Sequence, residues 1–167
     1  SNASPSVYNR PVTPPRLAAA LVLVLWAANA SAQTSPKAAM LEQDGWAALK
    51  AGQAQVAEKA FKDAIVLDPK NAALHLGLGT AAFLQRRDAD AKASLEQALI
   101  LSPRLVRARA QLGQVAKRQG DLAEAIRLYE QVAIEVPNDE GVRDTLDRWK
   151  REFELHERMR LTVGDHF

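Results

Sequence analysis

Small and apolar residues recur at one constant spacing through residues 38–137, in three successive copies. One glycine of each copy lies 34 residues from its counterpart in the next, and four further positions keep the same spacing. The five sets are Gly45, Gly79 and Gly113; Ala57, Ala91 and Ala125; Phe61, Leu95 and Tyr129; Ala64, Ala98 and Val132; and Pro69, Pro103 and Pro137. A fixed period of this length predicts stacked copies of one small unit, each too short to bury its apolar face alone.

Within each copy the pattern predicts two helices joined by a tight turn. Glycine and alanine are expected where the two helices cross, because a larger side chain there would hold the backbones apart. The bulky apolar residue that follows is expected to fill space toward the next copy. Proline then ends the second helix, since it lacks an N–H group and disfavours helical geometry in the residue before it.

This pattern resembles the tetratricopeptide repeat family, whose unit is a helix, a tight turn and a second helix. The resemblance implies an all-α fold, an α-solenoid of three helix-turn-helix units at residues 38–71, 72–105 and 106–139 with a concave inner surface. A capping helix at residues 138–160 is expected to close the last apolar face. The sequence departs from the family at two positions that are usually Trp and Tyr. Those positions hold Leu41, His75 and Arg109, and Ala48, Ala82 and Ala116.

Apolar spacing and turn residues together predict the bounds of seven helices. The expected ranges are about 36–50, 53–67, 71–85, 88–101, 103–119, 121–135 and 139–160. Helix N-caps are expected where Ser, Asn or Asp precedes a helix. These residues are Ser35, Asn71, Asp88, Ser102, Asp121 and Asn138. In the last helix one face is expected to be buried, with the apolar series Val142, Leu146, Trp149 and Phe153, continued by His156.

Residues 161–167 do not continue the helical spacing, and β-branched residues before Gly164 predict an extended tail. The segment from Trp149 to Phe153, followed by His166 and Phe167, resembles the junction in some exported repeat proteins whose repeats precede a peptidase MA-like metallopeptidase domain. That resemblance implies an alternative organisation. In it, these repeats are the N-terminal partner- or substrate-presenting arm of a larger exported enzyme.

The first 37 residues carry none of the repeat pattern. Residues 1–3 resemble the scar left by removal of a purification tag, and residues 33–37 are a short linker. Residues 4–32 have two arginines, an apolar run over residues 17–28 and small residues ending at Ala32, which is the layout of a secretory signal peptide. Cleavage is expected after Ala32, which places the mature protein in the periplasm or outside the cell.

The apolar run is too short for a stable membrane anchor, because a spanning helix needs about 20 apolar residues. A chain that keeps this run is expected to bury it, since an apolar patch of that size is unfavourable in water. We expect it to form a helix against the repeat array of its own or a neighbouring chain. In the second arrangement it would drive self-association.

Composition narrows the classes of function. The chain contains no cysteine, which excludes a disulfide framework and a thiolate site. Only Arg10 and Arg16 are charged among residues 1–32, so the remainder holds 20 Lys+Arg and 20 Asp+Glu from totals of 22 and 20. A balance of zero gives no argument for nucleic acid, and no aromatic residues interleave the cations as single-strand binding would need.

No set of residues has the spacing of a catalytic, cofactor-binding or metal-binding site. The three histidines lie far apart, and no second histidine follows His156 at the spacing of the zinc-protease helix. His75 is expected to pack at a junction between units. The sequence therefore predicts a protein that is not an enzyme and needs neither a cofactor nor a metal.

The residues most able to carry a function are on the first helix of each unit, which faces the concave surface in the family and at helical spacing. The candidate peptide-binding groove comprises Glu42, Trp46, Leu49, Leu76, Thr80, Phe83, Arg107, Gln114, Lys117 and Arg118. One end is aromatic and aliphatic and the other is cationic, although the cations also fit a plain solvated helix face. Such a groove suits a protein or peptide with apolar anchors and an acidic end.

Family members that hold the C-terminal carboxylate of a chaperone use Lys and Asn at two groove positions. The pairs found here are Glu42 and Trp46, Leu76 and Thr80, and Ala110 and Gln114, so this clamp is missing. The expected function is therefore a non-catalytic protein–protein interaction scaffold with a different partner.

Overall fold

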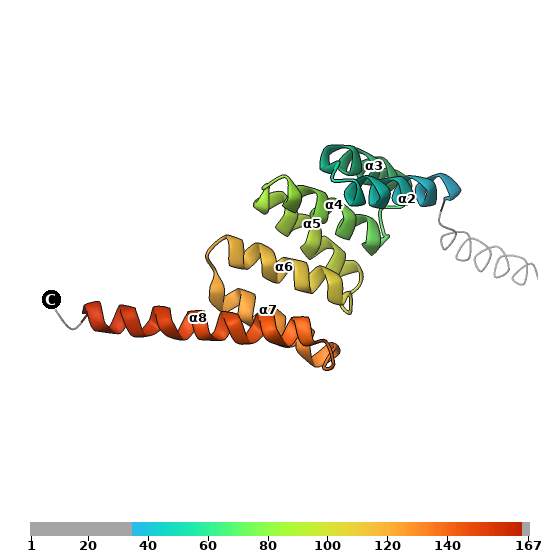
Figure 1. Ribbon diagram of the computed structural model, residues 1–167. Coiled ribbons are helices and arrows are strands. Elements are labelled where there is room, and N and C mark those ends of the chain that lie inside the picture. Colours follow the sequence, from blue (N-terminus) through green and yellow to red (C-terminus); the bar gives the residue numbers. More distant parts are fainter. Residues whose placement is uncertain (1–34, 165–167) are drawn as a thin grey trace, which may run out of the picture. The chain divides into compact units, whose positions relative to one another are not determined.

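The structure, a computed structural model, describes residues 35–164 of the 167-residue chain (Figure 1). Those residues form seven α-helices and contain no strand, which confirms the all-α prediction. The helices are α2 (Pro36–Lys50), α3 (Ala54–Leu67), α4 (Ala72–Leu84), α5 (Asp88–Leu101), α6 (Val106–Arg118), α7 (Leu122–Glu135) and α8 (Glu140–Gly164). The predicted tag scar, the signal peptide and the packing of its apolar run lie outside the described residues.

The helices pack as three successive pairs, α2 with α3, α4 with α5 and α6 with α7 (Figure 1). The second helix of each of the first two pairs contacts the first helix of the next pair. The first helices also touch one another, because α4 contacts both α2 and α6. Helix α8 packs against α7. This order confirms the predicted α-solenoid of three helix-turn-helix units with a capping helix.

The repeated glycines lie where the two helices of a pair meet. A Cβ atom added to Gly79 would lie 2.8 Å from Cγ of Leu95, and one added to Gly113 would lie 2.7 Å from Cδ2 of Tyr129. The bulky repeated residue therefore packs first against the glycine of its own unit. Phe61 also makes the predicted contact with the next unit, since its ring lies against Gly45 and against Gly77.

The repeated prolines end the second helices as predicted. Helix α3 ends at Leu67, α5 at Leu101 and α7 at Glu135, each two residues before its proline. Two of the predicted side-chain caps are also present. The carboxamide oxygen of Asn71 accepts the N–H of Ala73 at 3.0 Å, and the Asp121 carboxylate accepts the N–H of Glu124 at 3.0 Å.

Three of the other predicted caps, those of Asp88, Ser102 and Asn138, are wrong. Asp88 is already the first residue of α5, and its carboxylate binds Arg118 instead of a backbone N–H. Ser102 is the C-cap of α5 and not the N-cap of α6, which begins only at Val106. Helix α8 is capped by Asp139, not Asn138, because the Asp139 carboxylate accepts the N–H of Val142 at 3.1 Å. Ser35 occupies the N-cap position of α2 as predicted, although its side chain makes no capping hydrogen bond.

The extended tail predicted for residues 161–167 is wrong for residues 161–164, which continue α8 as a helix. Extending an established helix adds one hydrogen bond per residue, and this gain outweighs the weak strand preference of two β-branched residues. Residues 165–167 lie outside the described residues. They include His166 and Phe167 of the second resemblance, so the larger-enzyme organisation stays a prediction.

The buried face of α8 is shorter than predicted. Leu146 and Trp149 are buried and Val142 is half-buried, but Phe153 is 36% exposed and His156 is exposed. Helix α8 has 25 residues and its partner α7 has 14, so the longer helix continues past the surface that covers it. Figure 1 shows the C-terminal half of α8 projecting beyond α7.

Candidate functional site

The first helices α2, α4 and α6 carry the ten residues predicted to line the groove, which we call the inner face. These residues are Glu42, Trp46, Leu49, Leu76, Thr80, Phe83, Arg107, Gln114, Lys117 and Arg118. Because α4 contacts both α2 and α6, residues far apart in the sequence come together on this face. The contacts between them decide which side chains remain available to a ligand.

Trp46 and Arg107 meet although they belong to α2 and α6. The guanidinium carbon of Arg107 lies 5.3 Å from the centroid of the Trp46 ring, which is a cation–π distance. Trp46 also packs against Phe61, edge to face, with ring centroids 5.2 Å apart. Arg107 is exposed and has no ion pair with an acidic side chain in the described part of the chain. Its charge is therefore available to a ligand.

Two aliphatic members of the inner face contribute little accessible surface. Leu76 is only 3% exposed and belongs to the hydrophobic core, so its predicted place on the groove lining is corrected. It is buried because α4 is the middle helix of the face, with neighbours on both sides. Leu49 is half-buried and packs against the core of the first unit.

The polar inner-face residues are tied to neighbouring helices by hydrogen bonds. The pairs are Glu42 with Asn71 at 3.4 Å, Thr80 with Gln111 at 2.8 Å, and Gln114 with the hydroxyl of Tyr129. In the last pair the amide donates to a phenol whose pKa is raised by burial, so the Tyr129 hydroxyl is neutral at physiological pH. These hydrogen bonds hold the side chains of the inner face in place and leave them fewer free donors for a ligand.

The predicted cationic end is largely neutralised by the protein itself. Lys117 pairs with Glu152 of α8, and Arg118 pairs with Asp88 of α5. The guanidinium carbon of Arg118 also lies 3.6 Å from the centroid of the Phe83 ring. Arg118 therefore joins α6 to α4 and α5, and its charge is not free to attract a partner.

A surface pocket of about 430 Å³ opens where α4 and α6 end. Its lining residues are Phe83, Leu84, Arg86, Gln114, Lys117 and Arg118. Four of these belong to the inner face, so the pocket continues that surface. Leu84, the last residue of α4, has the helical spacing used to define the groove. Arg86 was not predicted from the sequence, because it lies in the turn after α4, outside that spacing.

Arg86 has an unusual backbone. Its φ is 62°, and among the described residues it is the only one other than glycine with a positive φ. The equivalent turns of the first and third units have Gly52 at 74° and Gly120 at 85°. An L-residue in this region costs about 1–2 kcal/mol, which glycine avoids. Aligning the three copies of the repeat reveals this difference in the sequence, because the second copy has arginine where the other two have glycine.

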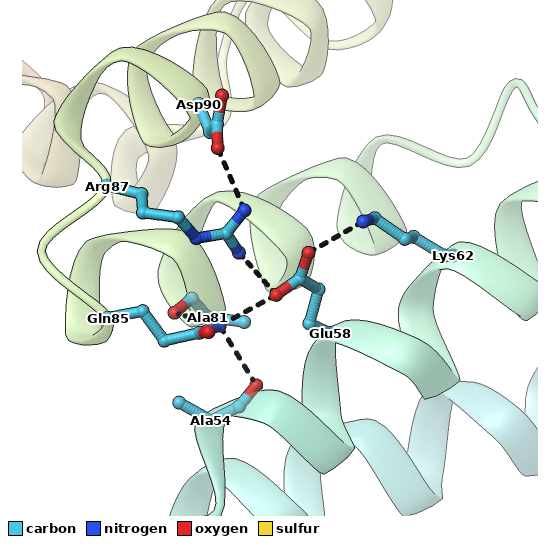
Figure 2. Close-up of polar contacts among 7 residues, drawn as sticks. All are labelled: Ala54, Glu58, Lys62, Ala81, Gln85, Arg87 and Asp90. Carbon is cyan, nitrogen blue, oxygen red and sulfur yellow. Dashed lines mark hydrogen bonds and ion pairs between the residues drawn. The ribbon is translucent and has the colours of Figure 1, made fainter.

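A second polar cluster joins the first two units without using any inner-face residue (Figure 2). The Glu58 carboxylate accepts hydrogen bonds from Lys62 at 2.6 Å, from Gln85 at 2.8 Å and from Arg87. Arg87 also reaches Asp90 at 2.8 Å. The bond from Lys62, followed by those from Gln85 and Arg87, lowers the pKa of Glu58 to about 2 against the opposing effect of desolvation.

This cluster stabilises the junction between units while Glu58 is ionised. The pKa of Glu58 is lower in the folded protein than in the unfolded chain, so the unfolded chain binds the proton first as pH falls. The contribution of Glu58 is therefore complete above about pH 5 and is lost as pH falls toward about 2. At neutral pH the cluster acts as a structural contact between α3 and the turn that leads into α5.

Little else in the described residues suggests chemistry. Residues 35–164 contain no group of three side chains that could hold a metal ion, and no buried side-chain nitrogen or oxygen there lacks a hydrogen-bond partner. His75 is half-buried, with a ring nitrogen 3.0 Å from the carbonyl oxygen of Pro69. No helix of this part of the chain combines the length and the apolar character that crossing a membrane requires.

Two family models, both described as tetratricopeptide repeat, match the sequence at residues 43–104 and 89–147. Together they span residues 43–147, which is more than half of the chain. The chain is a tetratricopeptide repeat protein. The two matches begin in α2 and end in α8, so they include all three helix pairs and the start of the capping helix. No curated protein matches the sequence.

Solved tetratricopeptide repeat domains share this fold. The first such domain of Spaghetti (RPAP3) has a TM-score of 0.69 at 24% identity, over 73% of this chain and 99% of that one. The second domain of human RPAP3 has a TM-score of 0.62 at 25% identity, over 68% and 95%. The TPR2B domain of yeast Sti1 has a TM-score of 0.64 at 20% identity, over 73% and 99%. At these identities the similarity establishes the fold.

Proposed function

We propose that this tetratricopeptide repeat protein is a non-catalytic scaffold that binds a peptide segment of a partner protein along its inner face. Similar domains support the proposal, since the structure of the Spaghetti domain contains the HSP90 peptide SRMEEVD and that of the human RPAP3 domain the HSP70 peptide SGPTIEEVD. Both peptides end in the acidic sequence EEVD. The proposed ligand of this chain is likewise an acidic peptide with apolar residues.

The observation that carries the proposal is the placement of Arg107 over Trp46. An exposed guanidinium without an acidic partner can bind a carboxylate through two N–H groups, and the ring beside it offers apolar surface. Arg and Trp are also the residue types that most often dominate binding energy at interfaces. Together they present one charge and one apolar surface on the inner face.

The proposed partner differs from the chaperone tails of the similar domains. At the positions where carboxylate-binding family members have Lys and Asn, this chain has Glu42 and Trp46 in its first unit. The Glu42 carboxylate would repel a second carboxylate at that site. The proposed contact for the acidic group is therefore Arg107, which has no acidic partner among the described residues.

Binding is tested by selecting ligands for the full chain from a library of random seven-residue peptides with free C-termini. The best selected peptide is then titrated against the unaltered protein and against Arg107→Glu. Reversing this charge puts repulsion in place of attraction, so we expect the affinity to fall about tenfold or more. Isothermal titration calorimetry measures the change.

Lys59→Glu is the matched control, because Lys59 is exposed and lies on α3, outside the inner face. It reverses the same charge and disturbs only a surface pair with Asp63, so the affinity is expected to change less than about twofold. Selection of no peptide, or equal affinities for the unaltered protein and Arg107→Glu, would contradict the proposed groove. Arg118 is unsuitable for this test, since its replacement breaks the pair with Asp88.

We also propose that the protein is exported and acts in the periplasm or outside the cell. The predicted cleavage after Ala32 would remove none of the described residues, because the first helix begins at Pro36. Expression in a Gram-negative host is expected to give a periplasmic protein whose N-terminal sequence starts at Gln33. Replacing Ala32 with Asp removes the small residue that the peptidase needs and should leave the precursor uncut. An unprocessed, cytoplasmic product from the unaltered gene would refute export.

A further inference from the structure

The turn of the second unit has an arginine where glycine would be more favourable. Arg86, Gly52 and Gly120 occupy equivalent positions and share the same left-handed backbone. A Cβ atom added to Gly52 or to Gly120 would have no neighbour within 4 Å, so packing places no demand on the side chain at this position. The unfavourable backbone of Arg86 therefore has no evident benefit for folding. Backbone strain of this kind concentrates where a side chain serves function.

The side chain of Arg86 is positioned to meet a ligand. It is exposed, its guanidinium forms no hydrogen bond or ion pair within the described residues, and it lines the pocket where α4 and α6 end. The pocket's other two cations are already compensated, Lys117 by Glu152 and Arg118 by Asp88. Arg86 accordingly supplies the uncompensated positive charge of this pocket.

The lining of the pocket also includes two apolar residues, Phe83 and Leu84. Leu84 is 52% exposed, and the Phe83 ring lies beneath the Arg118 guanidinium. A cation beside an apolar surface is complementary to a carboxylate that has an apolar residue next to it. The pocket is also continuous with the inner face, because it shares Phe83 and Gln114 with it.

We propose that Arg86 is a specificity-determining contact that binds one carboxylate of the peptide held on the inner face. This inference rests on the proposed function and extends it, since it assigns a second charge contact to a turn outside the predicted groove. The carboxylate is either an Asp or Glu side chain or the peptide's C-terminus.

The test uses the selected peptide and three forms of the full chain: unaltered, Arg86→Gly and Arg86→Lys. Arg86→Gly restores the residue of the other two turns, so its melting temperature is expected to be equal or higher while its affinity falls at least fivefold. Arg86→Lys keeps the charge and the backbone strain, and should retain most of the affinity. The affinity then falls without any loss of stability, which no simple loss of folding can produce.

Variants of the peptide identify the group that Arg86 contacts. Each Asp or Glu of the peptide is replaced in turn by its amide, and the C-terminus by a carboxamide. One of these changes is expected to remove the difference in affinity between the unaltered protein and Arg86→Gly. Lys59→Ala removes an equal charge from α3 and should leave every affinity unchanged.

The inference is overturned if Arg86→Gly binds the peptide as the unaltered protein does. It is also overturned if the affinity loss is the same for the acidic peptide and all its neutral variants, since the contact would then not involve a carboxylate. Peptides whose affinity depends on Arg107 and not on Arg86 would refute this inference but would still support the proposed groove. Failure to select any peptide would refute both.

Discussion

Gly77→Ala is expected to destabilise the protein by about 2 kcal/mol, although alanine is normally the better helix residue. A Cβ atom at this position would lie 2.3 Å from Cζ of Phe61, far inside van der Waals contact. The ring has no room to retreat, because it is fully buried and also lies against Gly45, where a Cβ atom would lie 2.7 Å from Cζ. The helices of two adjacent units must therefore move apart.

A double-mutant cycle with Phe61→Leu separates this clash from any general effect of alanine. Leucine lacks the outer ring atoms that a Cβ atom at Gly77 would meet, so in that background Gly77→Ala should cost less than half as much. Phe61→Leu alone is expected to cost about 1–2 kcal/mol for the lost packing. Urea unfolding followed by circular dichroism gives the four free energies.

Gly141→Ala is a useful control, since a Cβ atom there would meet only the Asp139 side chain, at 3.3 Å. It should change the free energy of unfolding by less than about 0.5 kcal/mol. A Gly77→Ala protein as stable as the unaltered one would show that Phe61 is not held between the two glycines. The packing account of the unit junction would then be wrong.

The sequence predicted the repeats well because helix packing depends on small residues at fixed spacing. Gly79 and Gly113 recur for a local reason, since each faces the bulky residue of its own unit. Gly77, which has the closest neighbour of the described glycines, was not predicted, because it occurs in only one copy. Its role comes from Phe61 reaching across a junction, which no single unit encodes.

The candidate groove was predicted less well, because long polar side chains choose partners across helices. Spacing placed Arg118 correctly on the first helix of its unit, but nothing in the spacing indicated that Asp88 would bind it. Asp88 itself had a plausible local role as a helix cap, and the distant contact took precedence. Arg86 was missed because the groove was defined by helical positions, whereas its significance lies in the backbone of a turn.

The capping helix illustrates the same limit. Its apolar spacing continues from Val142 through Phe153, but burial requires a partner as well as a pattern. Trp149 has one, because its ring lies 4.4 Å from that of Tyr129 between centroids, and it is only 4% exposed. Phe153 lies one turn further along and is 36% exposed. The sequence alone does not reveal where α7 stops covering α8.

Trp149→Ala is therefore expected to cost about 3–5 kcal/mol of unfolding free energy, the largest effect that we predict. The substitution removes a buried ring from the last apolar surface of the stack, and it also exposes Tyr129 and Leu146 to water. A repeat array transmits such a loss inward, because each unit is stabilised mainly by its neighbours. Loss of structure should begin at α8 and α7, which hydrogen exchange would show as reduced protection there first.

Phe153→Ala provides the matched comparison, an aromatic residue removed from the same helix one turn away. Because Phe153 is already 36% exposed, its loss should cost only about 1 kcal/mol and leave the protection of α7 nearly unchanged. A similar cost for both substitutions would mean that α8 is buried evenly along this stretch, as the sequence pattern predicted. A small cost for Trp149→Ala would show that α8 does not close the stack.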